Sequence, residues 1–296
     1  MSVALELGAL TLFAMALAAA ASPPPAASGE ALRLGFCTND LARAKAVGFD
    51  YAEIGVRDFA RLSDPDFESL VAAHQATGLP TLAGYVFLPA DLKIVGPEAD
   101  PELAMAYVSR ALARCERLGV RIIVFGSPAA RRAPEGFPRE QAFAQLVALG
   151  KRMAPVAQKH GVVLAAEPIR RAETNMVNTV AEGLAWAEGV GHPSFRFMVD
   201  LYHLVEEGED PAVLRQAGPR LAYAKLANPK GRVFPLPGDG YDYGPFLRAL
   251  REAGYGGPLG LETPADKLET DGRRSIAFLR EAWAAAGRAA RERRER

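Results

Sequence analysis

The chain reads VVLAAEP at 162–168, FRFMVD at 195–200, LAYAKLAN at 221–228 and PLGLET at 258–263. Each run has the nearly continuous apolar character of a strand that is buried on both faces of a parallel sheet. Each also carries one charged residue at or near its C-terminal end, and these are Glu167, Asp200, Lys225 and Glu262. An unpaired buried charge is costly, so four charges at the same end of four strands predict one shared site. Parallel α/β folds keep their chemistry at that end of the sheet.

Strands and helices alternate along the chain from residue 31 onward. Further strands are expected at 32–37, 51–55, 81–87 and 121–127. The clearest helical patterns lie near 101–118, 138–160, 179–189, 210–217, 242–253 and 270–286. Eight strand–helix units with short connections predict an α/β protein with a single (β/α)8 TIM barrel. The alternative is an open doubly wound sheet, which is disfavoured because no GxGxxG motif follows the first strand.

Composition limits the classes of partner. The 296 residues are 49% hydrophobic and carry 35 basic against 35 acidic side chains. No basic stripe occurs before the terminal RAARERRER, so nucleic acid is not an expected partner. Cys37 and Cys115 give no disulfide framework. We expect the barrel at residues 31–286, followed by a basic, frayed helix end at 287–296.

The N-terminal segment, residues 1–30, differs from the rest of the chain. It contains the apolar run LGALTLFAMALAAAAS followed by PPPAASGEA, and no Lys or Arg precedes Arg33. The run is typical of a secretory signal segment and is too short and Ala-rich for a permanent membrane span. This favours a periplasmic or secreted location and no membrane association of the mature chain. The alternatives are a disordered extension or a misassigned start, with a cytoplasmic protein.

Four local patterns occur in order in the second half of the chain. They are EPIRRAET from Glu167, DLYH from Asp200, Arg232 beside a Gly-rich turn, and GYGGPLGLE ending at Glu262. This succession resembles the xylose isomerase-like TIM barrel superfamily, particularly sugar isomerases and epimerases of the tagatose/psicose 3-epimerase kind. The resemblance covers residues 31–285 in layout and is specific from about 162 to 263.

The resemblance implies a divalent metal (manganese, magnesium, cobalt or zinc) held by Glu, Asp, His and Glu at the ends of strands five to eight. Glu167, Asp200 and Glu262 match three of these ligands, whereas Lys225 stands where the family has His. The resemblance also implies that the two glutamates move a proton next to a carbonyl. It further places Glu173, His203 and Arg232 against the substrate. Glu53, which ends the second strand, is expected either in the polar pocket wall or in a salt bridge.

Charge arguments single out Lys225. Three converging carboxylates raise one another's pKa unless a cation lies among them. A divalent ion is one such cation, and an ammonium, which cannot ligate a metal while protonated, is another. We expect Lys225 to pair with Glu167, Asp200 or Glu262 and to leave the protein without a tightly bound divalent ion. The alternatives are a loosely held metal beside a displaced lysine, or a Lys225 side chain that passes outward through the barrel wall.

These observations predict an enzyme of the isomerase or epimerase type. Glu167 and Glu262 would act as acid and base on a ketose, keto-sugar or keto-cyclitol, with either a metal or Lys225 as the positive charge near the enediolate oxygen. A lyase or dehydratase acting on a keto-inositol or 3-keto-glycoside begins with the same proton abstraction and stays open. So does a catalytically silent sugar-binding barrel. The expected partner is a small sugar, and a homo-oligomer is compatible with the sequence.

Overall fold

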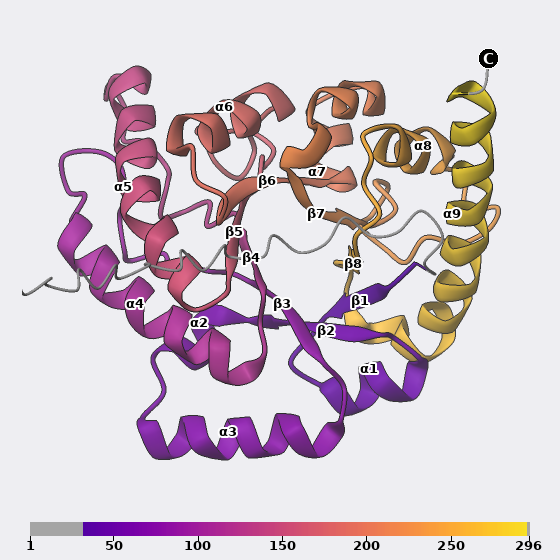
Figure 1. Ribbon diagram of the computed structural model, residues 1–296, viewed down its shortest axis with the longest axis horizontal. Coiled ribbons are helices and arrows are strands. Elements are labelled where there is room, and N and C mark those ends of the chain that lie inside the picture. The colour runs from indigo at the N-terminus through magenta and orange to yellow at the C-terminus, as the bar shows by residue number, and fades with distance from the viewer. Residues whose placement is uncertain (1–31, 295–296) are drawn as a thin grey trace, which may run out of the picture.

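Eight parallel strands close into a barrel in the computed structural model, which describes residues 32–294. Each strand pairs with the next along the chain, and β1 pairs with β8, so the sheet has no free edge (Figure 1). The strands are β1 (Leu34–Cys37), β2 (Tyr51–Gly55), β3 (Thr81–Tyr85), β4 (Ile122–Phe125), β5 (Val163–Ala166), β6 (Phe195–Asp200), β7 (Leu221–Leu226) and β8 (Leu259–Leu261). This is the predicted (β/α)8 TIM barrel.

Helices surround the strands in Figure 1. They are α1 (Leu41–Val47), α2 (Val56–Ala60), α3 (Asp64–Thr77), α4 (Pro101–Leu118), α5 (Arg139–Lys159), α6 (Val180–Val190), α7 (Leu201–Glu206), α8 (Gly244–Glu252) and α9 (Arg273–Arg294). Short 3₁₀ turns lie at Pro211–Gln216, Gly218–Arg220 and Ala265–Lys267, and a π turn lies at Leu268–Gly272. Between residues 32 and 294, no helix has the length and apolar character needed to cross a membrane.

Local sequence explains where several helices begin and end. The Ser63 side chain accepts a hydrogen bond from the Asp66 amide at the start of α3, and Gly78 ends that helix at φ 64°. Thr179 and Glu182 form a reciprocal capping box at the start of α6. Both arrangements satisfy backbone groups that a helix end leaves without partners.

Some elements differ from the expectation. The strand expected at 81–87 ends at Tyr85, because Val86 adopts φ 50°, which is incompatible with a strand. The helix expected near 210–217 is a 3₁₀ turn, and α2 and α7 are short helices that the sequence patterns did not indicate. The helix expected near 270–286 continues as α9 to Arg294. The proposed segment 1–30 lies outside the described residues.

The barrel interior is a small apolar layer beneath the charged mouth. Tyr51, Ala83, Val124, Ala165, Met198 and Tyr223 form this layer, separate from the large core between strands and helices. The strand register then sets the mouth: Asp200 lies opposite Lys225, and Lys225 lies opposite Gly260. Because all strands are parallel, the residues after their C-terminal ends meet above this layer.

Candidate active site

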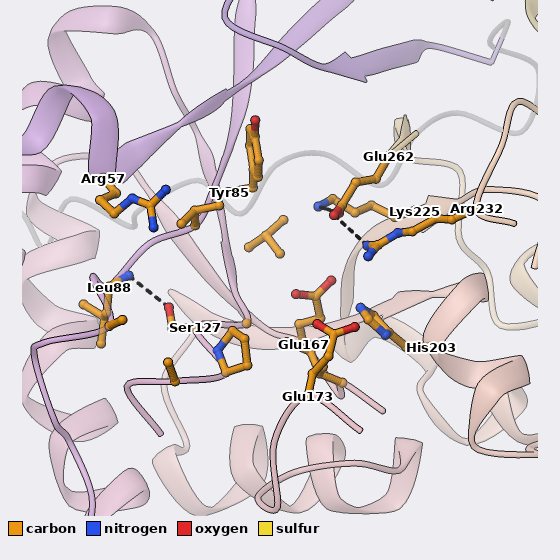
Figure 2. Close-up of a pocket in the computed structure, with 17 residues that line it drawn as sticks. Arg57, Tyr85, Leu88, Ser127, Glu167, Glu173, His203, Lys225, Arg232 and Glu262 are labelled. Carbon is orange, nitrogen blue, oxygen red and sulfur yellow. Dashed lines mark hydrogen bonds and ion pairs between the residues drawn. The ribbon is translucent and has the colours of Figure 1, made fainter. Parts of the chain in front are cut away.

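A pocket of about 250 Å³ lies at the mouth of the barrel (Figure 2). Most of its charged lining comes from the ends of the last four strands and the segments that follow them, whereas β3, β4, their loops and α2 supply other lining residues. The residues that line it and bear on the chemistry are Glu167, Glu173, His203, Lys225, Arg232 and Glu262. The structure therefore brings together residues that lie nearly a hundred positions apart in the sequence.

Lys225 occupies the floor of this pocket, inside the barrel and not outside its wall. Its side chain is 1% exposed, and Nζ lies 2.7 Å from Glu262 Oε2 and 2.7 Å from Glu53 Oε1. The first contact is a hydrogen bond, and the second is an ion pair whose angles fall outside those of a hydrogen bond. Burial lowers the pKa of Lys225, but the acidic groups around it outweigh burial and raise the pKa well above its usual value. The amine is therefore an ammonium.

Glu262 is held between two cations. Oε2 accepts the hydrogen bond from Lys225, and Oε1 accepts one of 2.6 Å from Arg232 Nη2. Burial raises the pKa of Glu262, yet Lys225 and Arg232 outweigh burial and lower it to about 2. Both carboxylate oxygens are thus committed to fixed positive charges.

The Arg232 side chain is held in place by an aromatic ring and by carboxylates. Its guanidinium stacks on the Tyr202 ring at 4.7 Å from the centroid and lies 3.7 Å from Asp200 Oδ2. The residue adopts φ 53°, an uncommon backbone conformation for a side chain of this size. Contacts on several sides therefore fix the guanidinium at the pocket edge.

The surroundings of Glu167 favour its protonated form, whereas those of Glu262 favour the carboxylate. Its carboxyl group makes no hydrogen bond or ion pair with any residue from 32 to 294. Burial raises the pKa of Glu167 to about 8, against the opposing effect of Lys225. Gly126, at the end of β4, makes room for this side chain, since a Cβ there would collide with Glu167 Oε2. At neutral pH, Glu167 carries a proton and Glu262 does not.

His203 lines the pocket, and Asp200 is a buried neighbour of His203 and Glu167. Asp200 Oδ1 accepts a 2.8 Å hydrogen bond from the Tyr202 amide and so caps α7, while Oδ2 has no hydrogen-bond partner within residues 32–294. In the described part of the chain, His203 Nδ1 also lacks a hydrogen-bond partner. Burial and the nearby Arg232 charge lower the pKa of His203 to about 4. Potential ligand atoms of Glu167, Asp200 and His203 lie within 4.8 Å of one another. Glu173 accepts a 2.8 Å hydrogen bond from Arg170 Nε.

The four-ligand metal site that the resemblance implies does not fit these residues. The fourth position is a buried ammonium, which has no lone pair for a metal. Each Glu262 oxygen accepts a hydrogen bond from a cation, Lys225 or Arg232, so coordination of a metal by Glu262 would compete with both. Asp200 Oδ2 and His203 Nδ1, which have no hydrogen-bond partner among residues 32–294, lie in the field of Arg232, a fixed cation.

Some contributors were not identified from the sequence. Glu53 was considered for a salt bridge, but its pairing with Lys225 was not foreseen. Arg131 was missed: it is fully buried, donates to the backbone oxygens of Phe125 and Val177, and its charge lowers the pKa of Glu167. Arg131 and Arg132 are adjacent in a loop, and no sequence pattern shows which of the two is buried.

Comparisons with known proteins agree with this architecture. The family model described as Xylose isomerase-like TIM barrel matches residues 41–282. An L-ribulose 3-epimerase from Methylomonas sp. (strain DH-1) is 29% identical over 234 residues, covering 77% of this chain and 78% of the relative. A D-psicose 3-epimerase from Agrobacterium fabrum is 25% identical over 268 residues, covering 81% and 91%.

Solved structures show the same fold. The crystal structure of a D-psicose 3-epimerase in the presence of D-fructose has a TM-score of 0.73 at 20% identity, covering 85% of this chain and 99% of that one. An L-ribulose 3-epimerase structure has a TM-score of 0.72 at 22% identity, covering 88% and 97%.

Proposed function

The chain belongs to the xylose isomerase-like TIM barrel family, and we propose that it is an epimerase that inverts the carbon next to the carbonyl of a small ketose. Supporting this, the curated relatives described above are ketose 3-epimerases that align over three quarters or more of the chain. The substrate class is therefore a ketopentose or ketohexose, and the pocket of about 250 Å³ suits a molecule of that size.

One observation carries the proposal: two glutamates, one buried and one partly buried, line the same pocket with pKa values shifted in opposite directions. Glu167 and Glu262 reach the pocket from different sides in Figure 2, and their pKa values are about 8 and about 2. Inversion needs a base on one face of the reacting carbon and an acid on the other. Two identical side chains with separated pKa values meet this requirement.

The proposed reaction has two proton transfers. The Glu262 carboxylate removes the proton from the carbon beside the carbonyl, and the bonding electron pair moves to the carbonyl oxygen to give an enediolate. The Glu167 carboxyl then delivers its proton to the opposite face of the same carbon. In the reverse direction the two residues exchange roles. Substrate oxygens that draw hydrogen bonds from Lys225 or Arg232 would release Glu262 from its ion pairs and make it a stronger base.

The remaining polar residues suit substrate binding. Neutral His203 and Glu173 line the pocket, where the hydroxyl groups of a sugar would need donors and acceptors. A buried polar atom that gains a hydrogen bond only from the correct substrate contributes to specificity.

The test is isotope exchange in deuterium oxide. D-fructose, D-psicose and L-ribulose are each incubated with the protein, and nuclear magnetic resonance measures deuterium at carbon 3 together with the epimeric product. We expect exchange and epimerisation for at least one ketose. Glu167→Gln and Glu262→Gln should each lose about 10²–10⁴-fold in rate, the range of general acid–base contributions.

The control is the exposed Glu98→Gln, which should retain wild-type rates. Sugar binding without exchange for every ketose would favour the catalytically silent barrel instead. Exchange followed by loss of water or of a glycosidic group would favour the lyase alternative.

A further inference from the structure

We propose that the Lys225 ammonium takes the place of the divalent metal in this site, and that Glu53 is the positioning residue that holds it there. The catalysis would then be independent of metal ions. This inference rests on the proposed function for its catalytic part, and on the geometry of the site alone for the exclusion of metal.

Lys225 is fixed from two sides. Glu53 belongs to β2 and Glu262 follows β8, and each carboxylate lies 2.7 Å from Nζ. An ammonium has three N–H donors. Within residues 32–294 no third acceptor is bonded to Nζ, although the group lines the pocket. Among the described residues, only one N–H donor is used in a hydrogen bond, to Glu262, so a donor remains available for a substrate oxygen.

Glu53 cannot follow a displaced lysine, because it is anchored in the barrel interior. Its side chain is fully buried, and Oε2 accepts a 2.9 Å hydrogen bond from the Tyr223 hydroxyl. That hydroxyl lies 2.9 Å from the Tyr51 hydroxyl. A chain of contacts thus leads from the interior layer through Glu53 to Lys225. A buried carboxylate without its cation is strongly unfavourable, so Glu53 and Lys225 require each other.

The fixed charges of the site nearly balance without a metal. Three cations, Lys225, Arg232 and Arg131, accompany four carboxyl groups, Glu53, Glu167, Asp200 and Glu262. A divalent ion added to this set would meet fixed positive charges on several sides. Any coordination by Glu262 would also require displacing Lys225 or Arg232 from that carboxylate.

The catalytic step needs no other cation. When a glutamate takes the proton from the carbon beside the carbonyl, the electron pair moves to the carbonyl oxygen. The free N–H of Lys225 then donates a hydrogen bond to that oxygen while it bears negative charge, and nothing is oxidised or reduced. When the carbon is reprotonated on the other face, the electron pair returns and the hydrogen bond weakens. A preorganised donor of this kind stabilises the transition state more than the substrate.

The first experiment measures metal. Wild-type protein is dialysed against a chelator, its metal content is measured by elemental analysis, and manganese binding is followed by calorimetry. We expect metal content far below one ion per chain and no manganese binding. Lys225→His supplies a neutral imidazole and should gain manganese affinity. The matched control is Lys230→His, the same change at an exposed position of the neighbouring loop, which should gain none.

The second experiment measures turnover. Wild-type epimerisation should be unchanged by the chelator, while that of Lys225→His should become dependent on manganese. Glu53→Gln should lower kcat by about 10²-fold, the loss expected for one misplaced donor, with little change in KM. Glu53→Asp should recover part of the loss. Thermal melting identifies variants that fail to fold. The turnover of Lys225→Arg then shows whether a positive charge at this position is sufficient for activity.

The outcomes separate the two proposals. Metal that stays bound to the wild type through dialysis, or turnover abolished by the chelator and restored by manganese, would overturn the inference and leave the epimerase function standing. Equal losses of kcat and thermal stability in Glu53→Gln and Glu53→Asp would overturn the positioning role. Absence of turnover in both the wild type and manganese-loaded Lys225→His would refute the proposed function, whatever the metal content.

Discussion

At the scale of single residues, neighbours decide the chemistry of otherwise identical groups. Glu167 and Glu262 are both glutamates that follow buried strands, and burial raises the pKa of each. They differ in their partners: Lys225 and Arg232 hold Glu262 as a carboxylate, whereas no cation among residues 32–294 pairs with Glu167. The sequence indicates both residues as candidates, but their separate states depend on side-chain contacts that only the fold creates.

Glu167→Gln should become more stable relative to the wild type as pH rises. The folded pKa of Glu167 is about 8, against 4.5 as its ordinary value. Between these values the folded state keeps a proton that the unfolded state releases, so this residue lowers wild-type stability as pH increases. Glutamine has no such proton. Thermal melts of both proteins at about pH 5 and about pH 8 measure the effect, and His203 contributes to both proteins alike.

A constant difference between the two melting temperatures across this range would contradict the prediction. It would mean that Glu167 ionises in the folded protein much as it does in the unfolded chain. The acid role of this residue in the proposed reaction would then have no electrostatic basis.

At the scale of elements, periodicity predicted the strands well and the short helices poorly. The strands 51–55 and 195–200 were predicted to the residue, because a buried parallel strand is an apolar run with polar ends. α2 and α7 were not predicted, since each has only five or six residues and starts directly after a strand. Helices this short have little periodicity of their own and depend on tertiary packing.

The candidate site was predictable where it depends on strand ends, and not where it depends on barrel closure. Parallel strands bring Glu167, Asp200, Lys225 and Glu262 to one mouth, and the alternating strand–helix pattern is enough to predict this. The Glu53–Lys225 contact joins β2 to β7, which are not neighbours in the sheet. That contact crosses the interior of the barrel, and its length depends on how tightly the eight strands close.

Gly260, in the middle of β8, makes this crossing contact possible. A Cβ at this position would collide with the Tyr223 hydroxyl and lie 2.9 Å from Glu53 Oε2. Gly260→Ala should therefore push Tyr223 and Glu53 aside and destabilise the protein by about 1–3 kcal/mol, as overpacked cores do. Chemical denaturation measures the loss.

The matched control for Gly260→Ala is Gly287→Ala in α9. There the nearest atom to an added Cβ is Nη2 of the Arg251 side chain at 3.0 Å, and alanine is the better helix former. This control should be neutral or slightly stabilising. Equal stability of the two variants would show that β8 tolerates the methyl group and that Glu53 is less firmly held than we infer.

At the scale of the whole molecule, closure of the sheet shows which part of the chain is needed to form the barrel. Leu34, Gly35 and Phe36 of β1 pair with Leu259, Gly260 and Leu261 of β8, so the barrel is closed within residues 34–261. α9 then packs against α8 and the π turn before it. Every strand of the barrel is thus present in a chain that starts at residue 31.

The final prediction concerns residues 1–30, which we propose act as an export segment and not as part of the barrel. Removing them should change the melting temperature by less than about 2 °C, which at this size corresponds to under ~1 kcal/mol, because all eight strand pairings remain. The same thirty residues, fused to a reporter enzyme that is active only outside the bacterial cytoplasm, should give activity. Leu12→Arg in the fusion is the control and should abolish it, since a charge in the apolar run opposes translocation. A large loss of stability on truncation would make the segment part of the fold, whereas an inactive fusion with unchanged stability would favour a cytoplasmic protein with a dispensable extension.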